Sequence, residues 1–99
     1  MAERQDTTRA VIFVRGRVQN VGFRWWTRAQ ALELGLVGHA RNLPDGRVEV
    51  MAQGTPENVQ TLQRRLSPEA AAGDRPGTVE GITVQSHPVR HALTGFRER

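Results

Sequence analysis

The segment from Gly16 to Gly22, with the sequence G-R-V-Q-N-V-G, has residue types and spacing that could bind an anion. Glycine at both ends leaves no room for regular structure and predicts a tight loop. Arg24 follows at the start of a predicted helix, where the positive end of the helix macrodipole disfavours a cation by about 0.3–1 kcal/mol. The backbone N–H groups of such a loop and one guanidinium suit the oxygens of a phosphate. The alternative, in which Arg24 is solvated or paired with Glu33 or Asp45, stays open at this point.

Arginine accounts for all fourteen basic residues, against ten acidic ones, and the formal net charge is +4. This charge is compatible with nucleic acid or with a small anion. The absence of lysine excludes Schiff-base catalysis and a P-loop lysine, and the absence of cysteine excludes cysteine catalysis, disulfides and iron–sulfur clusters. His39, His87 and His91 lack a ligand-like arrangement with acids, so we expect neither a metal nor a cofactor.

The chain of 99 residues and 11.0 kDa fits one compact domain. We expect a flexible N-terminal segment at residues 1–8 and a single domain at residues 9–99. The stretch from Met1 to Arg9 is polar and charged, so it resembles neither a signal peptide nor a membrane anchor. We therefore expect a cytoplasmic protein without a membrane partner, and a monomer, since nothing in the sequence indicates an obligate interface.

The elements that must position the loop follow from the hydrophobic patterns and the turn residues. A β-branched strand precedes the loop, and a helix with apolar residues three or four positions apart follows it. Thr55 and Pro56 provide the cap and first position of a second helix. The predicted ranges are strand 9–15, loop 16–22, helix 23–34, strands 36–41 and 47–52 around the turn N-L-P-D-G, a helix from 56 to 66, a surface loop at 67–77, strand 79–85 and a short edge at 95–97. This β-α-β-β-α-β order predicts an α+β, ferredoxin-like sandwich, in which a four- to five-stranded antiparallel sheet carries two helices on one face.

Two motifs resemble those of the acylphosphatase family. The stretch G-R-V-Q-N-V-G-F-R, from Gly16 to Arg24, resembles the first family signature, G-x-V-Q-G-V-x-F-R. The stretch G-H-A-R-N, from Gly38 to Asn42, resembles the second signature, together with the Gly46, Val48 and Gly54 that follow. The resemblance covers residues 9–97. It implies a hydrolase that cleaves the carboxyl-phosphate bond of a small acyl phosphate, releasing a carboxylate and inorganic phosphate.

The same resemblance implies a role for each motif residue. Arg24 would bind the phosphate oxygens, and Asn42 would hold the attacking water. An asparagine amide is too weakly basic to remove a proton, so Asn42 could orient water but could not act as a general base. The leaving carboxylate has a conjugate acid with a pKa of about 4, so no general acid is required. The backbone amides expected to cradle the phosphate belong to Arg17, Val18, Gln19, Asn20, Val21 and Gly22.

The chain departs from the family pattern at two positions. Asn20 stands where the family usually has glycine, and asparagine is the non-glycine residue that best tolerates a left-handed backbone. We therefore expect a retained loop with some strain or altered access, a departure that would lower the activity. His39 replaces an aromatic residue, which predicts a variation in packing or at the surface.

Two other functions fit the predicted fold. An RNA-binding module would need exposed aromatic residues on its central strands in the pattern K/R-G-F/Y-G/A-F-V-x-F/Y, and the strand at residues 47–52 has none, so we do not expect a nucleic-acid partner. The second alternative is a non-catalytic domain that binds phosphate or carbamoyl phosphate. Such a chain would be similar to the acylphosphatase-like segment that begins some larger carbamoyl-transferring maturation proteins. The short length and the absence of zinc-finger cysteines argue against it.

Overall fold

The computed structural model describes residues 6–70 and 73–99 and contains the predicted succession of elements. Every predicted boundary lies within two residues of the observed one. The elements are β1 (Thr8–Arg17), α1 (Phe23–Glu33), β2 (Val37–Asn42), β3 (Val48–Gly54), α2 (Pro56–Leu66), β4 (Thr78–His87) and β5 (Phe96–Glu98). Most of the expected flexible segment at residues 1–8 lies outside the described residues. Its last residue, Thr8, pairs with Gly54, so β1 begins one residue earlier than predicted.

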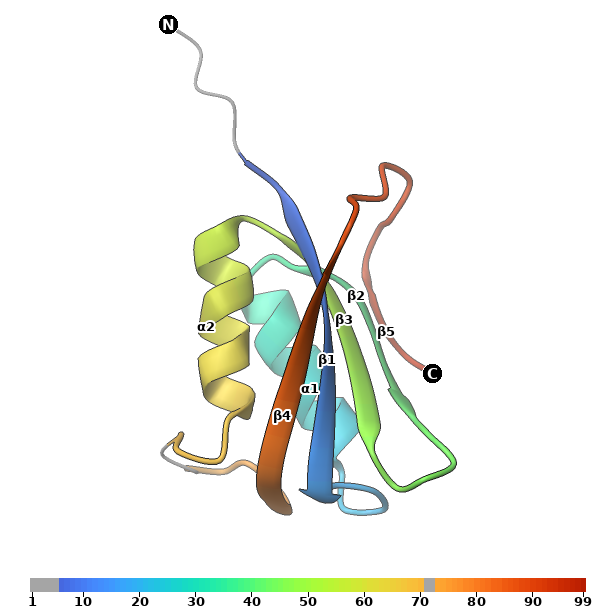
Figure 1. Ribbon diagram of the computed structural model, residues 1–99, viewed down its shortest axis with the longest axis vertical. Helices are drawn as coiled ribbons and strands as arrows, with labels where there is room; N and C mark the ends of the chain where they lie inside the picture. The colour runs from blue at the N-terminus through green and yellow to red at the C-terminus, as the bar shows by residue number, and fades with distance from the viewer. Residues whose placement is uncertain (1–5, 71–72) are drawn as a thin grey trace, which may run out of the picture.

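The five strands form one sheet in the order β4-β1-β3-β2-β5, and both helices cover the same face (Figure 1). The pairs β4–β1, β1–β3 and β3–β2 are antiparallel, as predicted. The prediction of an entirely antiparallel sheet is wrong for the last strand, because β5 pairs with β2 in parallel, with Phe96 opposite Gly38. The segment 88–95 passes over one end of the sheet, so the chain returns along the far edge in the direction of β2 (Figure 1).

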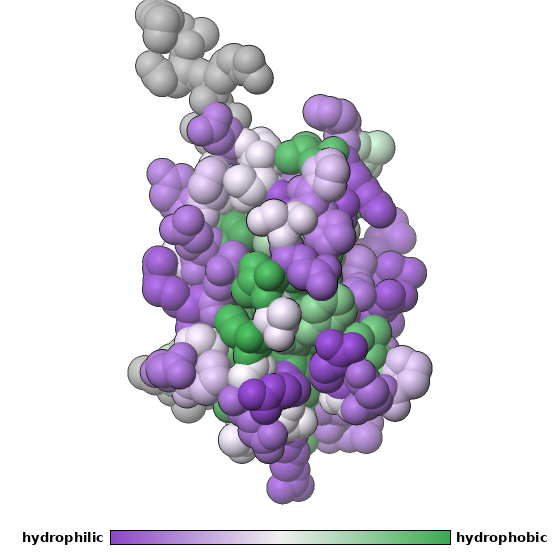
Figure 2. Space-filling model, viewed as in Figure 1, coloured by the Kyte–Doolittle hydropathy of each residue, from purple (hydrophilic) through white to green (hydrophobic). Residues whose placement is uncertain are grey.

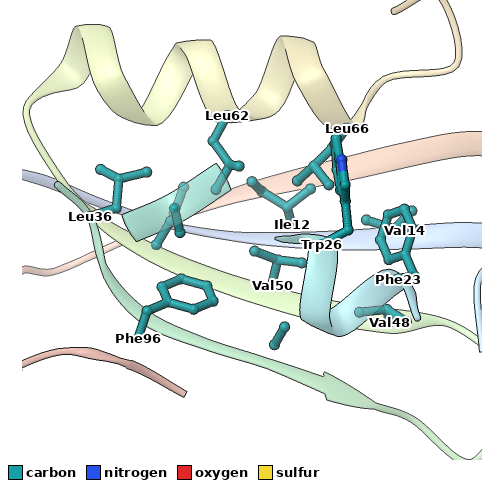
Figure 3. Packing of buried hydrophobic residues seen from close by; sticks show 14 of the residues in the cluster. Ile12, Val14, Phe23, Trp26, Leu36, Val48, Val50, Leu62, Leu66 and Phe96 are labelled. Atoms are coloured by element: carbon teal, nitrogen blue, oxygen red, sulfur yellow. The ribbon is translucent and has the colours of Figure 1, made fainter. Parts of the chain in front are cut away.

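The core lies between the sheet and the two helices, and strand alternation decides which side chains enter it. Ile12 and Val14 of β1 point towards the helices and are fully buried, as are Leu62 and Leu66 of α2 (Figure 3). Phe96 closes the core beside β2, as expected from its place near the C-terminus. The remaining buried hydrophobic residues of this cluster include Ala10, Val18, Phe23, Trp26, Ala31, Leu36, Ala40, Val48, Val50, Ala52, Val59 and Val79.

The two adjacent tryptophans of α1 lie in different environments. Trp26 is 7% exposed and packs beside Phe23, with 5.8 Å between the ring centroids. Trp25 is 64% exposed. A helix turns by about 100° per residue, and the buried side of α1 contains Phe23, Trp26, Thr27 and Ala31, so Trp25 points away from the core. The expectation that one of them faces inward is confirmed.

The second helix begins as its sequence predicts. The Thr55 hydroxyl accepts a hydrogen bond from the backbone N–H of Asn58, at 3.2 Å, and Pro56 occupies the first helical position. The described parts of the loop at 67–77 contain no helix or strand, as expected. None of the helices in the described residues is long and apolar enough to cross a membrane.

An irregularity in β1 leads the chain out of the sheet. The pairing of β1 with β4 shifts between Arg15 and Gly16, and Gly16 has a φ of +138°. A Cβ atom on Gly16 would lie 2.2 Å from the carbonyl oxygen of Thr78. Glycine is therefore required here both by the backbone angle and by the close approach of β4.

We expect Gly16→Ala to lower the free energy of unfolding by about 3 kcal/mol or more, because the new methyl group meets main-chain atoms as well as an unfavourable φ. Gly46→Ala is the matched control, since Gly46 has a φ of +96° but its added Cβ would meet nothing within 4 Å. The control should lose about 1–2 kcal/mol, the cost of the backbone angle alone. Urea unfolding followed by circular dichroism measures both values, and equal losses would contradict the proposed steric contact.

Candidate functional site

The candidate anion-binding loop connects β1 to α1 at one end of the sheet (Figure 1). Arg17 is the last residue of β1 and pairs with Thr78, so the loop begins at Val18 and not at Gly16 as predicted. Asn20 and Gly22 have φ values of +62° and +85°. The expected left-handed backbone at Asn20 is therefore confirmed. Left-handed residues in a tight turn are the backbone feature that builds anion-binding concavities from successive N–H groups.

The N-terminus of α1 adds further donors to this loop. Gly22 is the N-cap and has no side chain to accept the free N–H groups of the first turn. The first turn contains no acidic residue, so the positive end of the helix dipole has no compensating charge. The first main-chain bond of the helix runs from the N–H of Trp26 to the carbonyl of Gly22 at 3.0 Å. This end of α1 is therefore suited to a negatively charged ligand.

The Gln19 side chain fixes the loop against the turn that connects β2 to β3. Its Nε2 donates hydrogen bonds to the carbonyl oxygens of Leu43, at 2.8 Å, and Arg47, at 2.9 Å. Leu43 follows Asn42 directly in the chain, and a bond from the N–H of Leu43 to the carbonyl of Arg47 closes the turn. From the sequence, Gln19 was expected to contribute only its backbone amide. An uncharged amide with two N–H donors in a loop was the one available signal of this role.

Asn42 is the last residue of β2 and lies opposite Val48. It is two positions from Ala40, which is fully buried under the helices, so strand alternation places both side chains on the helix-covered face. The Oδ1 atom of Asn42 is buried and accepts no hydrogen bond from any residue within 6–70 and 73–99. A buried acceptor left unpaired costs about 1–3 kcal/mol, so this oxygen is suited to accept from a water molecule or a ligand.

Arg24 does not pair with either of the acids that the sequence left open. Glu33 forms an ion pair with Arg65, and Asp45 forms one with Arg47 at 2.8 Å. The guanidinium of Arg24 instead donates through Nη1 to the backbone carbonyl of Arg99. The interpretation of Arg24 as the partner of Glu33 or Asp45 is therefore wrong, and no acidic side chain among the described residues pairs with it.

Hydrogen bonds join the site residues to β2 and to the turn that follows it. Arg24 donates to the carbonyl of Arg99, whose N–H donates to the carbonyl of Ala40 at 2.8 Å. Gln19 connects the loop to the turn that begins just after Asn42. The tertiary structure thus brings the loop, Arg24 and Asn42 to one end of the molecule.

The turn itself is stabilised by Asp45. Its carboxylate accepts from the backbone N–H of Arg47 at 3.1 Å and from the Nε of the same residue at 2.8 Å. The hydrogen bond from the Arg47 backbone lowers the pKa of Asp45 below its ordinary value, and the Arg47 guanidinium contributes in the same direction. Asp45 therefore shapes the turn after Asn42 and is not part of the anion-binding loop.

His39 lies on the opposite face of β2 from Asn42. Its Nε2 is 2.8 Å from Oε2 of Glu49, and the Oε1 of Glu49 accepts a hydrogen bond from Nη2 of Arg41 at 3.2 Å. Burial acts to raise the pKa of Glu49, but the hydrogen bonds from His39 and Arg41 outweigh it and hold the pKa below its ordinary value of 4.5. His39 thus forms a polar contact on the uncovered face, away from Arg24. Within the described residues, no group of three or more histidine, aspartate or glutamate side chains is arranged to hold a metal ion.

Comparisons with known proteins agree on one family. The family model described as Acylphosphatase matches residues 10–98. A protein of Mycobacterium sp. (strain KMS) named Acylphosphatase is 50% identical over 95 residues, which cover 96% of this chain and 97% of the relative. The crystal structure of acylphosphatase from Bacillus subtilis has a TM-score of 0.80 at 31% identity and covers 93% of this chain and 98% of its own. Full-length HypF, in its phosphate- and nucleotide-bound form, contains the same fold, with a TM-score of 0.80 at 17% identity over 12% of its chain.

We expect Gln19→Glu to lower the free energy of unfolding by about 1–3 kcal/mol at pH 7. The substitution keeps the shape of the side chain but replaces the N–H donor by a carboxylate oxygen that faces two carbonyl oxygens. Gln60→Glu makes the same chemical change at an exposed position of α2 and should alter stability by no more than about 0.5 kcal/mol. Denaturant unfolding measures both. A Gln19→Glu variant as stable as the control would mean that this side chain does not hold the loop.

Proposed function

The chain belongs to the acylphosphatase family and hydrolyses acyl phosphates, and from this premise we propose how its residues perform the reaction. The loop from Arg17 to Gly22 and Arg24 bind the phosphoryl group, and Asn42 orients the attacking water. The observation that carries this assignment is the buried Oδ1 of Asn42, an acceptor without a donor among the described residues. Asn42 lies at the end of β2. The loop is bonded to Leu43, the next residue, and Arg24 is connected through Arg99 to Ala40 of the same strand.

The phosphoryl oxygens would meet two kinds of donor. Backbone N–H groups of the loop and of the first turn of α1 supply a fixed, positively polarised concavity. The Arg24 guanidinium keeps N–H groups beyond the one bonded to Arg99, and it adds a full positive charge. Because these groups are held by the fold before substrate arrives, they stabilise charge on the phosphoryl oxygens without reorganising.

The reaction then needs a positioned water and a good leaving group. The water oxygen forms a new bond to phosphorus as the bond between phosphorus and the carboxyl oxygen breaks, and the carboxylate leaves with the electron pair. Both protons of the water end on the phosphate, so an acyl phosphate of charge −2 gives a carboxylate and dihydrogen phosphate. The Oδ1 of Asn42 accepts a hydrogen bond from one O–H group of the water and so directs a lone pair of the water oxygen at phosphorus. Asn42 takes no proton. Positioning and electrostatics therefore supply the catalysis.

A carboxylate leaves without protonation because its conjugate acid has a pKa of about 4. The alkoxide of an ordinary phosphate monoester would need a general acid, for which the proposed site assigns no residue. We therefore propose that the enzyme distinguishes acyl phosphates from monoesters by the leaving group, and that it requires no metal ion. We also propose that it acts as a monomer and independently of nucleic acid.

We expect purified enzyme to hydrolyse benzoyl phosphate at the same rate with and without EDTA, and to leave a phosphomonoester intact. Arg24→Ala and Asn42→Ala should each lower kcat/KM by about 10²-fold or more, the usual effect of removing one stabilising group. Asn42→Ala should act on kcat while the inhibition constant of inorganic phosphate stays constant. Arg24→Ala should weaken phosphate inhibition as well.

Arg28→Ala is the control for this experiment, because Arg28 lies one turn further along α1 and donates to the carbonyl of Phe96 at 3.0 Å. It removes the same kind of contact between α1 and β5 but leaves the proposed site intact, so its kinetics should match those of the wild type. If wild-type enzyme binds phosphate but does not hydrolyse benzoyl phosphate, the binding-module alternative takes over. Equal losses in all three variants would assign Arg24 to structure alone.

The left-handed backbone of Asn20 gives an independent prediction. Asparagine is partly strained in this conformation because of its Cβ atom, whereas glycine adopts it without strain. We expect Asn20→Gly to raise turnover or tighten phosphate inhibition several-fold, and Asn20→Ala to lower stability by about 1 kcal/mol. Steady-state kinetics with benzoyl phosphate and thermal unfolding measure these effects. A rate in Asn20→Gly that is unchanged or lower would show that the loop is already optimal with asparagine.

A further inference from the structure

The face of the sheet that the helices leave uncovered contains a second, strongly basic pocket. It has a volume of about 320 Å³ and is lined by four arginines, Arg9, Arg41, Arg90 and Arg99, and by a single acid, Glu49. The arginines come from separate parts of the chain: β1, β2, the segment after β4 and the residue after β5. Figure 2, which shows this face, has hydrophobic side chains along its middle and hydrophilic ones on both sides of them.

Arg9 is the most unusual member of this group, because it is only 9% exposed. Its Nε donates to the carbonyl oxygen of Pro88 at 2.6 Å. No ion pair links it to a carboxylate in the part of the chain that the structure describes. Burying a guanidinium without a counter-charge is unfavourable, so the position of Arg9 favours an anion beside it.

The segment after β4 holds a second arginine at the edge of the pocket. The buried Gln53 side chain donates to the carbonyl of Arg90 at 2.8 Å and accepts from its backbone N–H at 2.9 Å. These two bonds fix the backbone of Arg90 over the sheet. Its guanidinium forms no ion pair with any residue within 6–70 and 73–99. The backbone of Arg90 is thus fixed, and its guanidinium is available to a ligand.

The one acid in the pocket is already engaged. Glu49 lies 3.0 Å from the Nε of Arg41 and 2.8 Å from His39. No other acidic side chain lines the pocket, so the guanidinium groups of Arg9, Arg90 and Arg99 have no carboxylate side chain to pair with among the lining residues. Three guanidinium groups around one small pocket exceed what a single carboxylate would neutralise. They match an anion that carries at least three charges over several atoms.

We propose that this pocket binds a linear polyphosphate group, such as tripolyphosphate or the triphosphate of a nucleotide. Its volume lies in the range of small-molecule sites. A single-stranded RNA is the less suitable occupant, because the Arg47 guanidinium covers the ring of Phe13, 4.8 Å from its centroid, and closes this aromatic face to stacking. The pocket is distinct from the proposed phosphoryl site, since His39 and Arg41 point to the opposite face of β2 from Asn42. The inference does not depend on the proposed catalytic roles.

The test is isothermal titration of the full chain with sodium tripolyphosphate and, separately, with ATP. We expect one-to-one binding that Arg90→Ala and Arg9→Gln each weaken about tenfold or more, the effect of losing one charged hydrogen-bond donor. Arg64→Ala removes the same charge from α2 and should bind as the wild type does. Arg24→Ala should weaken the binding less than Arg90→Ala does, because it removes only a bond to the backbone of Arg99. This difference separates the pocket from the phosphoryl loop. Thermal unfolding followed by circular dichroism verifies that each variant is folded. If the substitution of the buried Arg9 by Gln unfolds the chain, Arg90→Ala still tests the proposal.

Several outcomes would overturn the proposal. Binding that disappears in Arg24→Ala but persists in Arg90→Ala would place the ligand at the phosphoryl loop. Equal weakening in Arg64→Ala would indicate a response to net charge alone. Binding of ATP without binding of tripolyphosphate would mean that the nucleoside is recognised and the polyphosphate is not. A uridine 12-mer that binds more tightly than tripolyphosphate, and loses affinity in Arg90→Ala, would make this face a nucleic-acid surface.

Discussion

The short reversal between the central strand β1 and helix α1 constrains the rest of the site. Five residues, Val18 to Gly22, take the chain from the sheet to the helix layer. A reversal of this length needs left-handed backbone, which Asn20 and Gly22 supply. The same turn presents backbone N–H groups next to the free end of the helix. A backbone geometry suited to an anion is therefore a consequence of how the strand connects to the helix.

The reversal is held from two sides. Val18 anchors it in the core, where its side chain is 1% exposed, and Gln19 connects it to the turn after β2. This second contact matters for chemistry because it fixes the loop relative to Asn42. A phosphoryl group and a water molecule must meet within a fraction of an ångström, and positioning of that kind comes from rigid supporting contacts. The chain provides this contact with an uncharged amide, the side chain of Gln19.

Arginine serves three physical purposes in this chain without lysine. Arg24 and Arg28 of α1 donate to main-chain carbonyls and hold the helix to β5. Arg41, Arg47 and Arg65 neutralise acids. Arg9 and Arg90 line the uncovered face of the sheet without an acid partner among the described residues. The alternation of β2 separates these roles, since it directs Asn42 to the helix-covered face and His39 with Arg41 to the other.

Local patterns in the sequence determined the order of the elements, the caps and the loop. The hydrophobic spacing of residues 23–34, the Thr55–Pro56 helix start and the glycines around the loop are short-range signals, and each predicted the local structure within two residues. The resemblance of two short motifs to the acylphosphatase signatures also suggested the phosphate chemistry and the roles proposed for Arg24 and Asn42. These features depend on neighbours in the chain and can be inferred without the fold.

Contacts between distant residues were decided only by the tertiary structure. The parallel pairing of β5 depends on how residues 88–95 cross the end of the sheet, which no local pattern encodes. The partner of Arg24 is a backbone carbonyl 75 residues away, and the acids that sequence proximity offered pair elsewhere. The hydrogen bonds from Gln19 to the turn after β2 likewise join separate segments, and so does the basic pocket around Arg9. Such contacts arise when packing of the core brings segments together, so they become visible only in the folded chain.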